Sequence, residues 1–241
     1  MHRPTATLCA LVAAIGCIAA ASATADVPAP TTVPSLFTRP GELLGHTLRF
    51  RGALPADQAG KMLLVQRQEA NGAWTQTATA TIAPDGSFIA RWRTDEIGSF
   101  TVRALIAGAQ AQTAEATTPT TNVTIYRPAR ATWFGPGFYG KHTACGQVMS
   151  HALLGVAHRT LPCGTPVAIF YGGKSITVPV IDRGPFANGA RYDLTSGVAQ
   201  ALGMTQTSTI GVVPQRGAKM APPQPAPSPY AGTGGATPTA P

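Results

Sequence analysis

The segment Val180-Ile181-Asp182-Arg183-Gly184-Pro185-Phe186 brings a buried strand to an end beside two charged side chains. The residues from Ile176 to Ile181 are mostly apolar, which is the pattern of a buried strand. Gly184-Pro185 then stops the strand from continuing. A carboxyl group at a strand end is held in one direction and is partly desolvated, which suits proton transfer. Asp182 is therefore a candidate acid or base, and the alternative is that it only accepts turn amides or pairs with an arginine.

The region around this segment, residues 131–215, consists of short apolar runs separated by turn residues. Val167–Tyr171 and Ser175–Ile181 are predicted strands that Gly172-Gly173 would join as a hairpin. Gly197–Leu202 is predicted as one short helix, capped by Thr195 or Ser196 and ended by Gly203. Short strands with a single helix on a glycine-rich path predict a small closed β-barrel.

An aromatic and glycine-rich stretch, Trp133 to Gly140, lies near the start of this region. Aromatic faces suit the apolar C–H side of a sugar ring, and glycines let the backbone bend sharply. Trp133 and Tyr139 are therefore candidate sugar contacts. The alternative is that Trp133 and Phe134 are strand residues that point into a core.

The N-terminus has the layout of a secretion signal. A positive start is followed by an apolar run, Leu8 to Ala20, that is too short to span a bilayer. Ala23-Thr24-Ala25 then offers the small residues that a signal peptidase reads. We expect a signal peptide over residues 1–25 and a bacterial protein that is secreted or held in the cell envelope. Gly16-Cys17 also suits a lipid anchor at Cys17, and we expect no transmembrane helix in the mature chain.

The chain of 241 residues carries a net charge of +8, although only 12% of its residues are charged. A basic chain favours anionic partners. Its positive charges look scattered, and it has neither zinc-finger spacing nor an aromatic-basic ribonucleoprotein motif, so we expect no nucleic acid. An anionic polymer met outside the cell is the predicted partner, and we expect a monomer.

Two cysteines, Cys145 and Cys163, remain once the N-terminal segment is removed. An even pair in an exported chain predicts a disulfide bond. One other interpretation is a cysteine nucleophile assisted by His158. Another is a zinc site built from the nearby histidines and cysteines, which are His142, Cys145, His151, His158 and Cys163. That spacing matches none of the standard zinc patterns, so we favour the disulfide and expect no metal and no cofactor.

Residues 45–127 are predicted to form a separate all-β domain. Short strands recur at a spacing of about 8–12 residues with no helix between them, which is typical of a β-sandwich. The layout resembles bacterial immunoglobulin-like (Ig-like) modules and suggests a spacer or a carbohydrate-contact module. Residues 26–44, rich in Pro, Thr and Ala, are predicted as a linker, and residues 216–241 as a disordered tail.

Five segments of the second domain carry a specific resemblance and occur in the order 131–135, 143–146, 157–165, 180–186 and 193–195, with the sequences Ala-Thr-Trp-Phe-Gly, Thr-Ala-Cys-Gly, Ala-His-Arg-Thr-Leu-Pro-Cys-Gly-Thr, Val-Ile-Asp-Arg-Gly-Pro-Phe and Asp-Leu-Thr. Together they resemble the RlpA (rare lipoprotein A) family in its cysteine-containing form. The resemblance implies a six-stranded double-psi β-barrel in a wall-associated protein. It also implies a lytic transglycosylase that cleaves peptidoglycan between N-acetylmuramic acid and N-acetylglucosamine.

Cleavage of this kind needs one carboxyl group, because the C6 hydroxyl of the sugar itself attacks and no water has to be activated. We assign that role to Asp182, with His158 assisting, although His158 could equally be a structural histidine bonded to a loop amide. The predicted substrate contacts are Gln147, Trp133, Tyr139, Arg183 and Asp193.

Two positions depart from the family pattern. Active relatives often carry Glu and Asp where this chain has Gln147 and Ser150, and a glutamine cannot transfer a proton. The alternative function is therefore a non-catalytic, expansin-like module that binds or loosens peptidoglycan. A third class is a secreted inhibitor or signalling protein that reuses the barrel.

Overall fold

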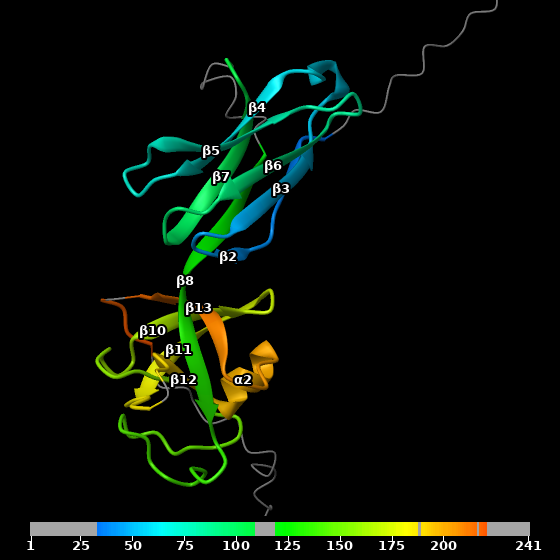
Figure 1. Cartoon of the computed structure of the whole chain (residues 1–241). Helices are drawn as coiled ribbons and strands as arrows, with labels where there is room; N and C mark the ends of the chain where they lie inside the picture. Colours follow the sequence, from blue (N-terminus) through cyan, green and yellow to red (C-terminus); the bar gives the residue numbers. More distant parts are fainter. Residues whose placement is uncertain (1–32, 109–118, 188, 216, 221–241) are drawn as a thin grey trace, which may run out of the picture. The chain divides into compact units, whose positions relative to one another are not determined.

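The computed structural model describes residues 33–108, 119–187, 189–215 and 217–220 (Figure 1). Loops and turns connect the strands of these residues, whose other regular elements are one short 3-10 helix, η1 (Ala56–Gln58), and one α-helix, α2 (Ser196–Leu202). The all-β class expected from the sequence is confirmed. The predicted signal peptide, Cys17 and the tail beyond Met220 lie outside the described residues. Within the described part of the chain, no helix is both long and apolar enough to cross a membrane.

Two sheets enclose the first hydrophobic core. One sheet has the order β1-β3-β6 and consists of Ser35–Phe37, Thr47–Ala53 and Ser87–Arg93. The other has the order β5-β4-β7-β8 with β2 beside β8, and consists of β2 (Gly41–Leu43), β4 (Met62–Gln68), β5 (Trp74–Thr81), β7 (Gly98–Ile106) and β8 (Thr120–Phe134). Residues alternate between core and solvent, so β6 buries Phe88, Ala90 and Trp92.

The first part also contains two strands in the segment predicted as a linker. Strands β1 and β2 have only three residues each, which is too short for alternation to be visible in a sequence. The likeness of this two-sheet unit to Ig-like modules stays a prediction.

The second half of β8 begins a closed barrel. Around the barrel, β8 is followed by β12 (Tyr192–Thr195), β9 (Val156–Ala157), β11 (Lys174–Asp182), β10 (Pro166–Tyr171) and β13 (Ser208–Pro214), which pairs with β8 again. Apolar side chains from all six strands fill the interior, among them Val156, Ile169, Val180, Leu194 and Ile210. The predicted closed barrel is confirmed.

Helix α2 begins at Ser196, one residue before the predicted start, and ends at Leu202 as predicted. The Thr195 hydroxyl accepts a hydrogen bond from the Val198 amide, and Gly203 ends the helix in the left-handed conformation with a φ of 77°. Thr195 also donates its hydroxyl to the Leu153 carbonyl at 2.6 Å, so the cap ties the helix to the loop before β9. The single helix therefore has a fixed place directly after β12.

We expect Gly155→Ala to destabilise the barrel by about 1–3 kcal/mol, as overpacked core substitutions do. A Cβ at this position would lie 2.4 Å from Cδ1 of Ile181, a side chain that is 1% exposed. Chemical denaturation measures the effect. Cγ1 and Cγ2 of Ile181 would lie 2.5 Å and 2.9 Å from the same Cβ, and Ile181→Ala removes all three atoms. Gly155→Ala should therefore cost less stability in the Ile181→Ala background than in the wild type. An equal cost in both backgrounds would argue against this contact as the cause.

Candidate active site

Two carboxyl groups lie on one face of the barrel wall. In the strand register, Asp193 of β12 is opposite Thr132 of β8 on one side and Ala157 of β9 on the other, and Ala157 is opposite Asp182 of β11. Residues opposite each other in neighbouring strands share a face. Two strand spacings put the backbones of Asp182 and Asp193 about 10 Å apart. Only the methyl group of Ala157 lies between them in the register.

Asp193 is half-buried, and its environment favours the protonated form. Burial raises the pKa of this carboxyl above the ordinary aspartate value. The Thr132 hydroxyl donates to its Oδ1 at 2.7 Å and lowers the pKa in part, while the charge of nearby Asp182 raises it. Asp193 therefore keeps a proton to higher pH than a typical aspartate does, as a general acid requires.

An open hollow adjoins Asp193. It has a volume of about 420 Å³ and is lined by Thr132, Trp133, Pro185, Phe186, Ala187, Asp193 and Thr207. The side chain of Trp133 is 38% exposed and that of Phe186 is 78% exposed. Trp133 is therefore not buried in a core, and a contact between Trp133 and a sugar stays a prediction. Phe186 and Thr132 were not singled out as site residues, although the aromatic residue after Gly184-Pro185 was visible in the sequence.

Asp182 anchors a neighbouring loop at the end of β11. Its Oδ1 accepts hydrogen bonds from the Ala144 and Arg183 amides, each at 2.8 Å. The Cys145 amide donates to the neighbouring Ile181 carbonyl. A β-bulge also falls between Val180 and Asp182, and bulges re-aim the side chains at strand ends. Asp182 thus anchors the loop around Cys145 as well as facing the same side as Asp193.

Arg183 holds a second loop in place. Its guanidinium donates to the carbonyls of Leu161 at 2.9 Å and His158 at 3.3 Å, and lies 3.2 Å from Sγ of Cys163. These contacts fix residues 158–163 against the strand end. A contact between Arg183 and substrate stays a prediction.

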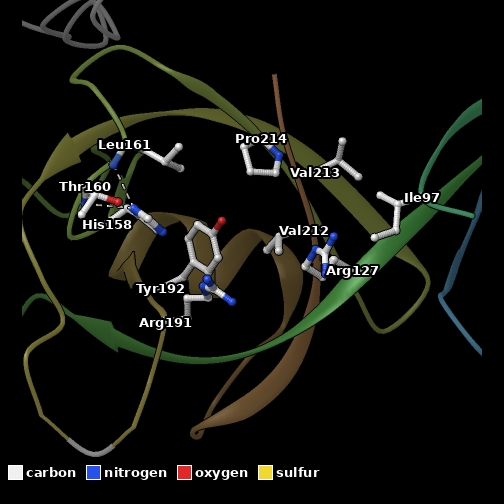
Figure 2. Close-up of a pocket in the computed structure, with 10 residues that line it drawn as sticks. All are labelled: Ile97, Arg127, His158, Thr160, Leu161, Arg191, Tyr192, Val212, Val213 and Pro214. Carbon is white, nitrogen blue, oxygen red and sulfur yellow. Dashed lines mark hydrogen bonds between the residues drawn. The ribbon is translucent and has the colours of Figure 1, made fainter. Parts of the chain in front are cut away.

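His158 belongs to the same loop and lines a different pocket, of about 460 Å³, together with Tyr192 (Figure 2). Its Nδ1 accepts from the amides of Thr160 at 3.2 Å and Leu161 at 3.0 Å, so in the neutral ring the proton is on Nε2. The imidazole lies beside the Tyr192 ring at a centroid distance of 4.8 Å. Tyr192 and Asp193 are consecutive in β12 and point to opposite faces. The described contacts give His158 a role in positioning the loop, and its part in catalysis stays a prediction.

The remaining predicted contacts, Gln147 and Tyr139, are not among the residues that line the Asp193 hollow in the described part of the chain. Gln147 Oε1 accepts from the Thr143 hydroxyl, and its side chain lines a small hollow of about 210 Å³ with Cys163 and Met220. Tyr139 donates its hydroxyl to Ser196, and its ring stacks on His151 at a centroid distance of 3.7 Å. One face of the Tyr139 ring is thereby covered.

Cys145 and Cys163 form a disulfide bond, with their Cα atoms 5.8 Å apart. The predicted pairing is confirmed. The two other interpretations of these cysteines, a nucleophile and a zinc site, are wrong, because both need a free thiolate. The bond joins the loop anchored by Asp182 to the loop held by Arg183.

A closed barrel of six strands with two loops clamped at the end of β11 defines a small double-psi β-barrel domain. Residues 128–215 match the family model described as lytic transglycolase. A Synechocystis protein named "Probable endolytic peptidoglycan transglycosylase RlpA" is 45% identical over 85 residues, which cover 34% of this chain and 26% of that protein. The endolytic peptidoglycan transglycosylase RlpA of Campylobacter jejuni is 39% identical over 84 residues, covering 34% and 30%. Over residues 128–215, the barrel is therefore similar to the RlpA family.

These similarities concern the barrel. The chain spans between a quarter and a third of the length of these two curated relatives. Among solved structures, a Streptomyces papain inhibitor is 24% identical, covers 35% of this chain and 91% of its own, and superposes with a TM-score of 0.28. A score this low supports no conclusion about function.

Proposed function

We propose that the barrel cleaves the glycan strands of peptidoglycan between N-acetylmuramic acid and N-acetylglucosamine, as an endolytic lytic transglycosylase of the bacterial cell envelope. The observation that carries the proposal is Asp193, a carboxyl with a raised pKa beside a hollow that Trp133 and Phe186 border. The names of the two relatives above support the substrate class.

Asp193 is suited to both proton transfers of this reaction. It first gives its proton to the glycosidic oxygen as the bond between C1 and that oxygen breaks. The C6 hydroxyl of the same N-acetylmuramic acid then attacks C1 and returns its proton to the carboxylate of Asp193. The product is a 1,6-anhydro sugar, no water is consumed, and the acid is regenerated.

Asp182 is the second carboxyl of the proposed site. The sequence favoured it as the acid, whereas the structure supports Asp193, because Oδ1 of Asp182 is occupied as an acceptor of two amides. On the same face as Asp193, a carboxylate at Asp182 would stabilise the positive charge that develops on the sugar ring. Trp133 and Phe186 would hold the neighbouring rings.

Digestion of purified sacculi tests the proposal. Incubation with the full chain should release fragments ending in 1,6-anhydro-N-acetylmuramic acid, identified by mass spectrometry. Fragments with ordinary reducing ends would indicate hydrolysis and would refute the transglycosylase mechanism. A folded protein that releases no fragment would reject the enzyme altogether.

The raised pKa of Asp193 predicts how cleavage and stability change with pH. Only the protonated carboxyl can donate, so the rate of cleavage should fall as the pH rises through this pKa. The unfolded chain loses the same proton near the ordinary value of about 3.9. The contribution of Asp193 to the free energy of unfolding is therefore full below that value and is lost as the pH rises through the folded pKa.

The variant Asp193→Asn is the reference for the pH dependence of wild-type stability, because asparagine does not titrate. Its stability relative to the wild type should improve as the pH is raised from about 4 through the folded pKa. Unfolding curves across this range measure the difference. A difference that stays constant with pH would contradict the assignment of the raised pKa to Asp193.

Gln147 favours a second candidate function, a peptidoglycan-binding module without catalysis. Its side chain cannot transfer a proton, and its Oε1 is held by the Thr143 hydroxyl. This function predicts that the chain sediments with sacculi and releases no soluble fragment. Export through residues 1–25, lipidation at Cys17 and a monomeric state stay predictions.

A further inference from the structure

The outer face of the sheet β1-β3-β6 carries four arginines. Arg49 and Arg51 of β3 and Arg91 and Arg93 of β6 are all exposed, and alternate with the buried residues of each strand. Arg49 is directly opposite Arg91 in the register. The sequence contains the pattern as Arg-Phe-Arg and Arg-Trp-Arg, two short motifs about forty residues apart. Four of the 18 positive charges that looked scattered along the chain are therefore gathered on one face, which we call the arginine face.

Acidic side chains do not neutralise the arginine face in the described part of the chain. Strands β1, β3 and β6 contain no Asp or Glu. Four acids elsewhere in this unit pair with other arginines: Glu42 with Arg39, and Glu69, Asp95 and Glu96 with Arg67. Asp57 accepts a hydrogen bond from the Gln58 side chain and Asp85 accepts one from the Ser87 amide. Among the described residues, no ion pair involves the four arginines of the face. A concentrated positive charge is thus left facing solvent.

Like charges directly opposite each other in a sheet are destabilising. The pair Arg49 and Arg91 therefore costs stability, and a surface that served only solubility would mix charges of both signs. An anion bound between the two side chains would offset this loss of stability. Spacings of about 5 Å across the strands and 7 Å along them bring several guanidinium groups within reach of one anionic segment.

A groove runs over this face. It has a volume of about 840 Å³ and is lined by Phe37, Thr38, Arg39, Thr47, Arg49, Arg51 and Arg91. The side chain of Phe37 is 66% exposed and is opposite Arg51 in the register. The groove therefore offers guanidinium groups, two hydroxyls and an aromatic ring, which together suit a polymer that carries both sugars and acidic groups.

We propose that the arginine face binds peptidoglycan through the carboxylates of its stem peptides, an inference that rests on the proposed function of the barrel. The planar guanidinium group binds a carboxylate with two parallel hydrogen bonds, which a lysine does not. Phe37 contacts the sugar rings beside those peptides. A second contact on the same polymer keeps the barrel at a high local concentration of glycan.

Sedimentation of the full chain with purified sacculi tests the inference. All proteins carry Asp193→Asn, so that the sacculi stay intact during the measurement. The double variant Arg49→Gln/Arg91→Gln should bind about threefold to tenfold more weakly near 0.1 M salt. The control Lys61→Gln/Lys174→Gln removes two charges outside the arginine face and should bind like the parent. Sacculi whose carboxylates have been amidated should bind the parent as weakly as untreated sacculi bind the arginine variant.

Two results would overturn the inference. One is equal binding by the arginine variant and the lysine control, and the other is binding that amidation does not change. Tighter retention on polyphosphate beads than on sacculi, lost with the arginine variant alone, would assign the face to a phosphate polymer instead. Since Arg49→Gln/Arg91→Gln removes a like-charge pair, its denaturation midpoint should equal or exceed that of the parent. Such a midpoint would exclude misfolding as the cause of weaker binding.

Cleavage is measured separately on glycan strands from which the stem peptides have been removed. The lactyl carboxylates that peptide removal exposes on N-acetylmuramic acid are amidated first. With Asp193 intact, Arg49→Gln/Arg91→Gln should then cleave these strands at the parental rate, because no carboxylate is left for the face to bind. If the parental protein cleaves nothing, the proposed function fails. The sedimentation result then still decides whether the arginine face binds peptidoglycan.

Discussion

Asp193→Asn is expected to lower the release of 1,6-anhydro fragments from sacculi by about 100-fold to 10,000-fold, the contribution typical of a general acid or base. The side-chain amide keeps the shape of the carboxyl group and can still accept from the Thr132 hydroxyl, which lies 2.7 Å from Oδ1. It has no proton to give to the glycosidic oxygen and cannot accept one from the C6 hydroxyl. The measurement is the initial rate of fragment release by mass spectrometry.

Asp182→Asn tests the competing hypothesis that Asp182, and not Asp193, is the general acid. Its amide oxygen can still accept from the Ala144 and Arg183 amides, so the loop anchor is kept. We expect a smaller loss, of about 10-fold to 100-fold, because only the stabilising charge on the same face is removed. Asp57→Asn, an exposed carboxyl in η1, is the matched control and should cleave at the parental rate. A larger loss of cleavage in Asp182→Asn than in Asp193→Asn would identify Asp182 as the acid.

Replacing both cysteines, in Cys145→Ser/Cys163→Ser, should lower the free energy of unfolding of the barrel by about 3 kcal/mol. The bond closes a loop with a sequence separation of 18, and the loss of that constraint stabilises the unfolded chain by this amount on the chain-entropy view. For a domain of this size, the melting temperature should fall by more than 10 °C, since each kcal/mol is worth about 4–8 °C.

Denaturant titration distinguishes the causes of this loss. The midpoint should move, and any rise in the slope would report a more expanded unfolded state, as expected when a covalent constraint is removed. Wild-type protein treated with a reductant should unfold at the same denaturant concentration as the double variant. A shift of less than about 1 kcal/mol would mean that Arg183 and Asp182 hold the two loops without the disulfide.

Local patterns in the sequence were enough to predict most of the strands, the single α-helix and the disulfide. Alternating apolar residues, the paired glycines at 172–173, and the cap and stop residues of α2 act on their own neighbourhood, so strands and helix could be predicted. The even number of cysteines in a chain predicted to be exported indicated the disulfide. Three-residue strands such as β1 and β2 could not be found, because their pairing partners are distant in the chain.

The sequence by itself determined the all-β class, the barrel with one helix, the disulfide and the group of residues from which the site is drawn. Only the tertiary structure decided which of them act together, because strand register is set by contacts between distant residues. Register aligns Asp193 with Thr132 and, across Ala157, with Asp182, and burial then raises the pKa of Asp193. The same physics places Arg49 opposite Arg91 and turns two separate motifs into one charged face.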